Sequence, residues 1–86
     1  MEKEKLTDLV ILTQKDDPTA ADRLFSVIYD DVYYFALKTV KDHHLAEDIT
    51  QEALIEVFCH IKELKDPVAF PAWCRQITYS RCTRYF

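Results

Sequence analysis

The feature that most constrains this chain is the complete absence of glycine from its 86 residues. Tight hairpin turns place residues at positive φ, a conformation that glycine adopts without steric cost. Helices joined by short polar loops are therefore favoured over sheets. A hydrophobic share of 49% with 30% charged residues permits a packed core, and this length suits one small domain. We expect residues 1–86 to form a single all-α domain.

Apolar residues recur three and four positions apart, the spacing of one helix face. We expect a short first helix from Thr7, as its N-cap, to about residue 15, and longer antiparallel helices over 19–40 and 43–64. A fourth helix should follow. The second helix should bury Leu24, Phe25, Ile28, Val32, Phe35, Ala36 and Val40. The third should bury Leu45, Ile49, Ala53, Val57, Ile61 and Leu64, with Leu54 and Phe58 at the flank.

Four aspartates and two prolines mark the helix boundaries. Asp16-Asp17-Pro18 predicts a turn, because proline pushes the preceding residue out of the α region. Asp42 is a candidate N-cap for the third helix. Asp66 is a candidate N-cap with Pro67 in the first helical position. The fourth helix should bury Phe70, Trp73 and Ile77.

One face of the third helix is polar and acidic. Positions i, i+3, i+4 and i+7 share a helix face, and here they hold Asp48, Gln51, Glu52 and Ile55. A polar strip with one exposed aliphatic suits a basic partner helix that offers an apolar contact point. An ordinary solvated helix face has the same pattern, so both interpretations stay open.

The charge is unevenly distributed. Residues 1–61 carry six Lys or Arg and thirteen Asp or Glu, a net charge of −7, whereas residues 62–86 carry five and two, a net charge of +3. An acidic body with a basic, aromatic-rich end indicates two surfaces with different partners. The basic end suits nucleic acid, and the acidic part suits a basic protein surface.

Two blocks of the sequence, AEDITQEALIEVF and PVAFPAWCRQI, resemble the second conserved region of the extracytoplasmic-function (ECF) sigma factors of bacterial RNA polymerase. The resemblance covers residues 24–86 and is carried by Asp48, Gln51, Glu52, Phe58, Pro67, Phe70, Trp73 and Ile77. It implies that an acidic face docks on the clamp helices of the polymerase β′ subunit. The residues of that face would be Asp48, Gln51, Glu52 and Ile55.

The resemblance also implies a DNA-binding function for the basic end. The loop over 64–69 and the fourth helix would hold the non-template strand of the promoter minus-ten element, with a base flipped into the loop. The candidate residues are Lys62, Lys65, Asp66, Arg75, Tyr79, Ser80, Arg81 and Arg84, with Tyr85 as a second stacking candidate. Asn is frequent in the family where Ser80 stands. An anti-sigma protein is a further implied partner, and a minus-thirty-five-binding domain lies outside these residues.

Other classes of function are disfavoured. Phosphate-binding loops need glycine, no nucleophile–base motif is present, and we expect no enzyme activity and no cofactor. Glu52, Glu56 and His60 share a helix face, but their spacing is not that of a di-metal bundle site, so we expect no metal. No apolar run approaches the ~20 residues of a membrane span and no targeting segment is visible, so we expect a cytoplasmic protein. Three thiols without a C-x-x-C pair are expected to be buried or half-buried and reduced: Cys59, Cys74 and Cys82.

An alternative function remains open. The chain would then be a small helical module that binds another protein through its acidic face and never binds DNA. The distribution of the cations on the fourth helix distinguishes the two hypotheses. DNA binding requires Arg75, Arg81 and Arg84 to gather on one side with the loop, whereas the alternative expects them to scatter.

Overall fold

The computed structural model describes the backbone of residues 3–85 and the side chains of residues 6–85. Within this part of the chain it contains four α-helices, α1 (Lys3–Gln14), α2 (Pro18–Val40), α3 (His43–His60) and α4 (Phe70–Cys82), and no strand. Three 3₁₀ turns span Ile61–Glu63, Pro67–Ala69 and Thr83–Tyr85. The predicted all-α, four-helix fold is confirmed.

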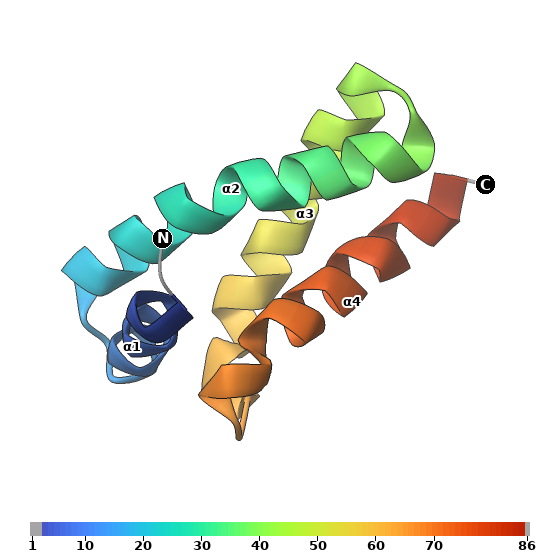
Figure 1. The fold of residues 1–86 in the computed structure, drawn as a ribbon. Helices are drawn as coiled ribbons and strands as arrows, with labels where there is room; N and C mark the ends of the chain where they lie inside the picture. Colours follow the sequence, from blue (N-terminus) through green and yellow to red (C-terminus); the bar gives the residue numbers. More distant parts are fainter. Residues whose placement is uncertain (1–2, 86) are drawn as a thin grey trace.

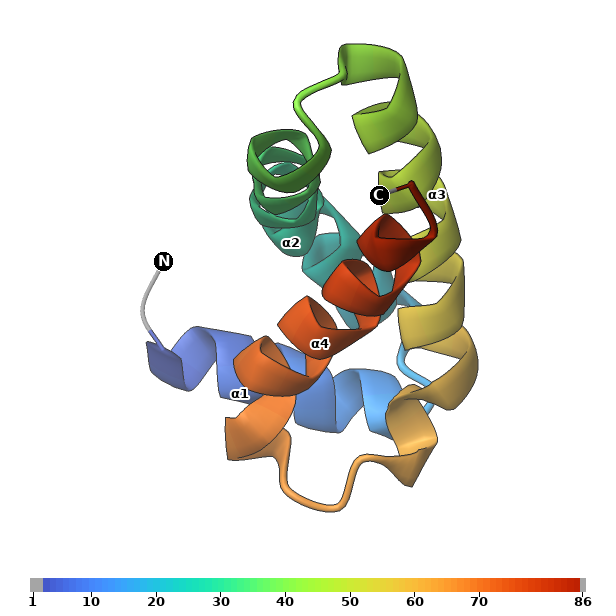
Figure 2. The same cartoon turned by 90° about the vertical axis from the view of Figure 1, so that its right-hand side faces the viewer.

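The helices α2 and α3 cross each other, α1 packs against α2, and α4 packs against both α2 and α3 (Figure 1). The chain reverses after α2, so that α3 runs back across it, and α1 packs beside the N-terminal half of α2. Figure 2 shows α4 lying against both α2 and α3. The loop between α3 and α4 projects at one end of the molecule, and the C-terminus lies towards the opposite end.

Side-chain caps start the helices where the sequence predicts. The Asp17 carboxylate accepts from the Ala20 N–H at 3.1 Å, and Asp42 accepts from the Leu45 N–H at 3.0 Å. Asp66 accepts from the Val68 N–H at 3.1 Å and so caps the 3₁₀ turn that leads into α4. Each carboxylate satisfies an N–H group that a helix start leaves unpaired.

Two loop positions have positive φ without glycine. Asp16 has a φ of 69°, and Lys41 has a φ of 58° and ends α2, its N–H donating to the Leu37 carbonyl at 2.7 Å. Glycine adopts this left-handed conformation more easily than any other residue. The chain therefore accepts a small steric cost at both turns and keeps a charged side chain at each.

Three sequence-based boundaries or placements were wrong. The helix α1 begins at Lys3, because Lys and Glu are good helix formers and extend it past the expected cap at Thr7. The helix α3 ends at His60 and tightens into a 3₁₀ turn, a common way for helices to end. Phe25 is 44% exposed, because α2 buries every fourth residue and leaves Phe25 beside that narrow row.

The core joins all four helices. Its largest buried side chains include Val10 of α1, Leu24 of α2, Leu54 and Val57 of α3, and Phe70 of α4. Three threonines are buried in it, and each donates its hydroxyl to the carbonyl four residues earlier: Thr13, Thr50 and Thr78. None of the described helices has the length and apolar character needed to cross a bilayer.

Candidate functional site

The acidic face predicted on α3 is exposed to solvent. Asp48 and Gln51 are exposed, Glu52 is half-buried, and Ile55 is 66% exposed although its side chain is aliphatic. An isolated exposed isoleucine needs no explanation. Ile55, however, adjoins other exposed apolar side chains, and together they form a hollow on this face.

Next to Ile55 lies a shallow hollow of about 390 Å³ with almost wholly apolar walls. The hollow is lined by Phe25, Gln51, Leu54, Ile55 and Phe58. The Phe25 ring lies 6.1 Å from the Phe58 ring and 5.8 Å from the Tyr29 ring, centroid to centroid. We call the exposed row Asp48, Gln51 and Ile55, together with Phe25 and this hollow, the docking face.

Sequence reasoning missed Phe25 as a surface residue. The apolar pattern placed it beside Leu24 in one buried row, although adjacent residues on a helix point about 100° apart. Leu24 is fully buried and Phe25 is not. The neighbouring pair of large apolar residues was itself a signal, since only one of the two can point to the centre of the core.

The loop between α3 and α4 presents charged and apolar side chains at one end of the molecule. Lys65 is exposed, and Val68 is 71% exposed on the 3₁₀ turn. Asp66 is also exposed, but its carboxylate is occupied in part by the Val68 N–H. The loop therefore offers a cation and an apolar surface on a backbone that its own cap holds in place.

Gln14, at the end of α1, fastens the start of this loop. Its Nε2 donates to the Ile61 carbonyl at 2.9 Å and to the Leu64 carbonyl at 2.8 Å. These bonds satisfy carbonyl groups where α3 has stopped being an α-helix. Nothing in the local sequence indicates the contact, because the partners are 47 and 50 residues apart.

We expect Gln14→Glu to lower the free energy of unfolding by about 1–3 kcal/mol, because a carboxylate would face two carbonyl oxygens in place of an N–H donor. Urea unfolding followed by far-UV circular dichroism measures the effect. Gln76→Glu on the exposed side of α4 is the matched control and should change stability by less than about 0.5 kcal/mol. Equal stability of the two variants would contradict the assigned contact.

Two predicted DNA-binding cations are engaged by carboxylates. Lys62 Nζ lies 2.7 Å from Asp16 Oδ1, and both side chains are exposed. Arg81 is half-buried, and its guanidinium donates to Glu56 at 2.8 Å and to Glu52 at 3.2 Å. The hydrogen bond that Arg81 donates to Glu56 is the main cause of the raised pKa of Arg81. Arg81 thus links α4 to α3, in part through Glu52, which is one of the residues predicted to bind the polymerase.

The cations of α4 do not gather on one side. Arg75 is exposed, and its guanidinium lies 5.8 Å from the ring centre of Phe35 on α2, a cation–π arrangement. Arg81 reaches α3 on the other flank of the helix. Arg84, Tyr79 and Ser80 are exposed. The scatter of Arg75 and Arg81 is the pattern expected for the protein-interaction alternative.

The side chains that share a helix face and could have been metal ligands form ion pairs or hydrogen bonds with other side chains. Arg81 holds Glu52 and Glu56, while His60 Nδ1 lies 2.9 Å from Glu63, a hydrogen bond that raises the pKa of His60. Over the described residues, no group of three His, Cys, Asp or Glu side chains is placed to hold a metal ion.

Comparison with known proteins identifies the family. The sigma-70 region 2 family matches residues 24–86. The ECF RNA polymerase sigma factor SigM of Bacillus subtilis (strain 168) is 42% identical over 40 residues, which are 46% of this chain and 24% of SigM. No solved structure matches the chain. Because the family match covers residues 24–86, which include the docking face, the loop and α4, the chain belongs to the sigma-70 region 2 family.

Proposed function

We propose that this domain acts in transcription initiation by docking on the β′ clamp helices of RNA polymerase through the docking face. The single observation that supports this most is the apolar hollow beside the exposed row of Asp48, Gln51 and Ile55. Membership of the sigma-70 region 2 family supports a function in transcription initiation. Phosphodiester chemistry would belong to the polymerase and not to this domain.

The chemistry of the docking face suits a basic helical partner. Asp48 and the acidic residues around it attract cations, and Gln51 can both donate and accept hydrogen bonds. Ile55 and Phe25 would enter apolar contacts that exclude water, and such central contacts carry most of the binding energy at an interface. The polar row would then form the rim and fix the register.

We further propose that the loop over 64–69 and α4 capture the non-template strand of the minus-ten element. Lys65, Arg75 and Arg84 are exposed, and within the described part of the chain none of them forms an ion pair with a carboxylate. Val68 and Tyr79 offer apolar and aromatic surface for an unstacked base. An anti-sigma protein that covers the docking face would block polymerase binding.

The docking proposal is tested by titrating the domain with the isolated β′ clamp-helix fragment. We expect micromolar or tighter binding by the wild type, and at least tenfold weaker binding by Asp48→Ala/Gln51→Ala, a loss of about 1.4 kcal/mol. Ile55→Ala and Phe25→Ala should each weaken binding about fivefold or more. Asp30→Ala/Gln76→Ala removes the same side-chain types from other exposed positions and should bind as the wild type does.

The outcomes separate the proposed function from its alternative. A folded wild-type domain that does not bind the clamp helices would exclude the docking proposal. Clamp binding without capture of a single-stranded minus-ten oligonucleotide in the presence of core polymerase would favour the second candidate, a protein-interaction module that does not bind DNA. Arg75 contacts α2 whereas Arg81 contacts α3, and this scatter of the cations favours that candidate.

A further inference from the structure

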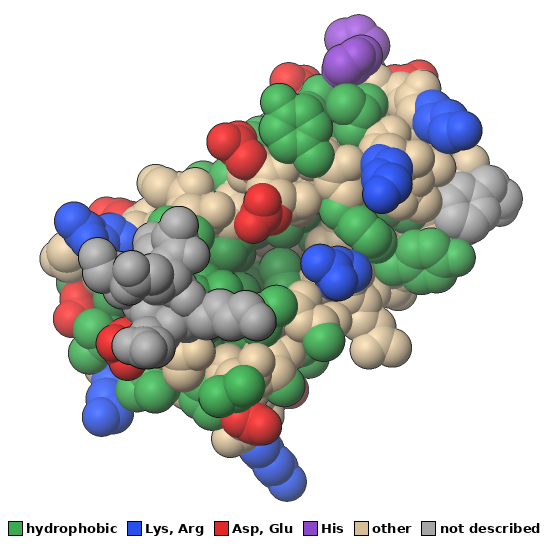
Figure 3. All heavy atoms as spheres, viewed as in Figure 1, with side chains coloured by type: hydrophobic (Ala, Val, Ile, Leu, Met, Phe, Trp, Pro, Cys, Tyr) green, Lys and Arg blue, Asp and Glu red, His purple; other side chains and the backbone are tan. Residues whose placement is uncertain are grey.

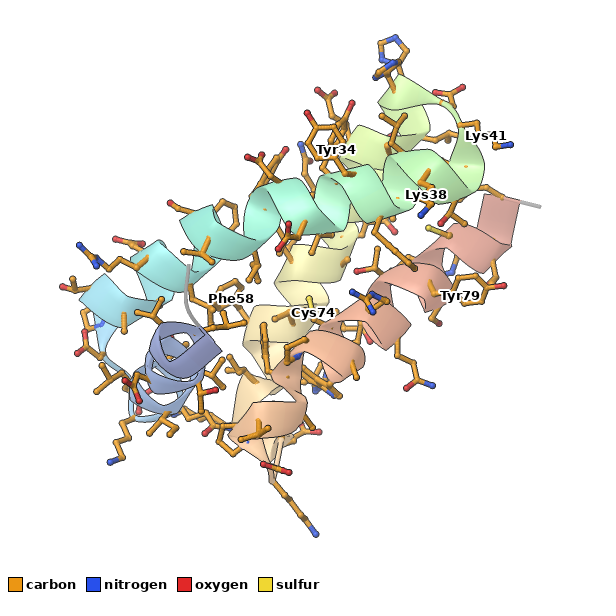
Figure 4. All side chains as sticks on the ribbon, viewed as in Figure 1. Tyr34, Lys38, Lys41, Phe58, Cys74 and Tyr79 are labelled. Atoms are coloured by element: carbon orange, nitrogen blue, oxygen red, sulfur yellow. The ribbon has the colours of Figure 1, made fainter. Side chains whose placement is uncertain are left out.

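Two further cations lie at the C-terminal end of α2, away from the loop, and Arg75 of α4 packs against the same helix. Figure 3 shows Lys and Arg side chains gathered over this end of α2 and the adjoining part of α4, with carboxylates nearer the middle of α2. The group consists of Lys38, Lys41 and Arg75, all of which are exposed. Figure 4 shows Lys38 on the same side of the molecule as Tyr79 of α4, with Lys41 at the end of α2.

These cations can bind a phosphate without first breaking an ion pair, whereas Lys62 and Arg81 cannot. Among the described residues, Lys38, Lys41 and Arg75 form no ion pair, whereas Lys62 and Arg81 are held by carboxylates. A phosphate that bound Lys62 or Arg81 would have to displace Asp16, or Glu52 and Glu56. A phosphate that bound the α2 group would displace only water and counterions, and the release of counterions drives nucleic-acid binding.

The backbone of Lys41 supports a function for its side chain. Its left-handed conformation is one that glycine adopts at lower cost, and residues held in such conformations tend to serve a function. The other position of this kind, Asp16, uses its side chain to hold Lys62. Lys41 makes no such ion pair and projects its charge from the end of α2.

Aromatic groups border the cations. Arg75 is held against the Phe35 ring on α2, which fixes its guanidinium beside that helix. Tyr34 is largely exposed on α2, and Tyr79 is exposed on α4. Cations interleaved with aromatic rings are typical of surfaces that bind a nucleic-acid backbone.

We propose that Lys38, Lys41 and Arg75 form a phosphate-binding track across α2 and α4 that contacts the promoter DNA backbone and carries no sequence information. The proposal rests on the proposed function, since the DNA is brought to this surface in the complex with polymerase. It extends the DNA-contacting surface to α2, which the sequence analysis did not include. The three cations outnumber their acidic neighbours, Asp31 beside Arg75 and Asp42 next to Lys41, so this surface would carry an excess of positive charge although the domain has a net charge of −4.

The test is the salt dependence of promoter binding by the domain in complex with core polymerase, using a fluorescent forked minus-ten probe. Each phosphate contact contributes about 0.9 to the slope of log K against log salt for duplex DNA and about 0.7 for a single strand. We expect Lys38→Gln/Lys41→Gln to reduce the magnitude of the slope by about 1.4–1.8. Affinity should fall about tenfold, by the same factor for matched and mismatched minus-ten sequences.

The matched control is Lys15→Gln/Arg23→Gln, which makes the same change in net charge at exposed positions in the turn after α1 and on α2 and should leave the slope unchanged. Lys41→Gly should weaken DNA binding about threefold while raising the midpoint of urea unfolding. A purely structural function of Lys41 predicts higher stability with unchanged DNA binding, and that result would overturn the proposal.

Other outcomes are equally decisive. If both double variants lower the slope of log K against log salt equally, the effect comes from the net charge of the domain and not from this surface. The proposed track would then be wrong. Weaker binding of Lys38→Gln/Lys41→Gln to polymerase without DNA would show that this surface contacts an acidic protein. If the wild type binds the probe and the double variant binds equally well, the proposed phosphate-binding track is wrong, but the proposed capture of DNA still stands. If the wild type in complex with polymerase does not bind the probe, the proposed capture of DNA fails.

Discussion

Phe70→Ala is expected to lower the free energy of unfolding by about 3–5 kcal/mol. Phe70 is the first residue of α4 and is 1% exposed in the core that joins the helices, with its ring 5.9 Å from that of Trp73. Removing the ring leaves a cavity that the surrounding helices can fill only in part. Domains of this size are stable by about 5–15 kcal/mol, so the loss is a large fraction of the total.

The measurement is urea or thermal unfolding followed by circular dichroism. Each kcal/mol shifts the midpoint of a domain of this length by about 4–8 °C, so Phe70→Ala should melt about 12–40 °C lower. Val68→Ala, two residues earlier and 71% exposed, is the matched control and should change stability by less than about 0.5 kcal/mol. Phe70→Leu should fall between the two. Equal melting of Phe70→Ala and Val68→Ala would show that Phe70 does not anchor α4.

The effect matters for function because Phe70 and Gln14 hold the two ends of the loop. Gln14 fixes the Ile61 and Leu64 carbonyls, and Phe70 fixes the residue at which the loop enters α4. Val68 and Lys65 are exposed between these anchors. A loop held at both ends loses less conformational entropy when it binds a strand than a loose one.

The helices were predictable because their signals are local. Apolar residues in α2 repeat at helical spacing, and Asp42 and Asp66 cap the N–H groups two or three residues ahead of them. The absence of glycine indicated the fold class. Among the described residues, the two positions with positive φ are occupied by Asp16 and Lys41. Each of these features depends on residues within one or two turns of one another.

The surfaces were only partly predictable because they depend on which flanks of distant helices meet. The spacing of Asp48, Gln51 and Ile55 defines one face of α3, and their exposure follows from it. The pattern could not show that Arg81 would reach Glu56, 25 residues earlier in the chain, or that Lys62 would reach Asp16. Such ion pairs decide which cations remain available to a partner, and sequence periodicity carries no information about them.

Cys74 is expected to react with a maleimide at pH 7.5 at least about a hundred times more slowly in the native domain than in the unfolded chain. Only the thiolate is nucleophilic, and burial raises the pKa of Cys74 from 9.0 to about 11. Burial also raises the pKa of Cys82. Cys59 is exposed, so the expectation that all three thiols are buried or half-buried was wrong for this residue. It should be the first thiol labelled, as mass spectrometry over time would show.

Figure 4 shows Cys74 on α4 among side chains of the neighbouring helices, and its 6% exposure limits access of the reagent as well. Cys59→Ser is the control variant, and in the native state it should show almost no fast labelling, whereas in urea both remaining thiols should react. Rapid native labelling of Cys74 would contradict the assigned burial.

The same burial predicts a loss of stability in alkali. The folded-state pKa of Cys74, about 11, lies above the unfolded value of 9.0, so the unfolded chain releases the proton first as pH rises. Folding stability is therefore complete below pH 9 and decreases between pH 9 and 11, by about 2–3 kcal/mol from this group. Cys74→Ala cannot release this proton, so its stability should fall less steeply over that interval in urea titrations at stepped pH. Because other groups titrate here as well, the difference between the two slopes isolates the thiol, and parallel slopes would show that Cys74 is solvated in the native domain.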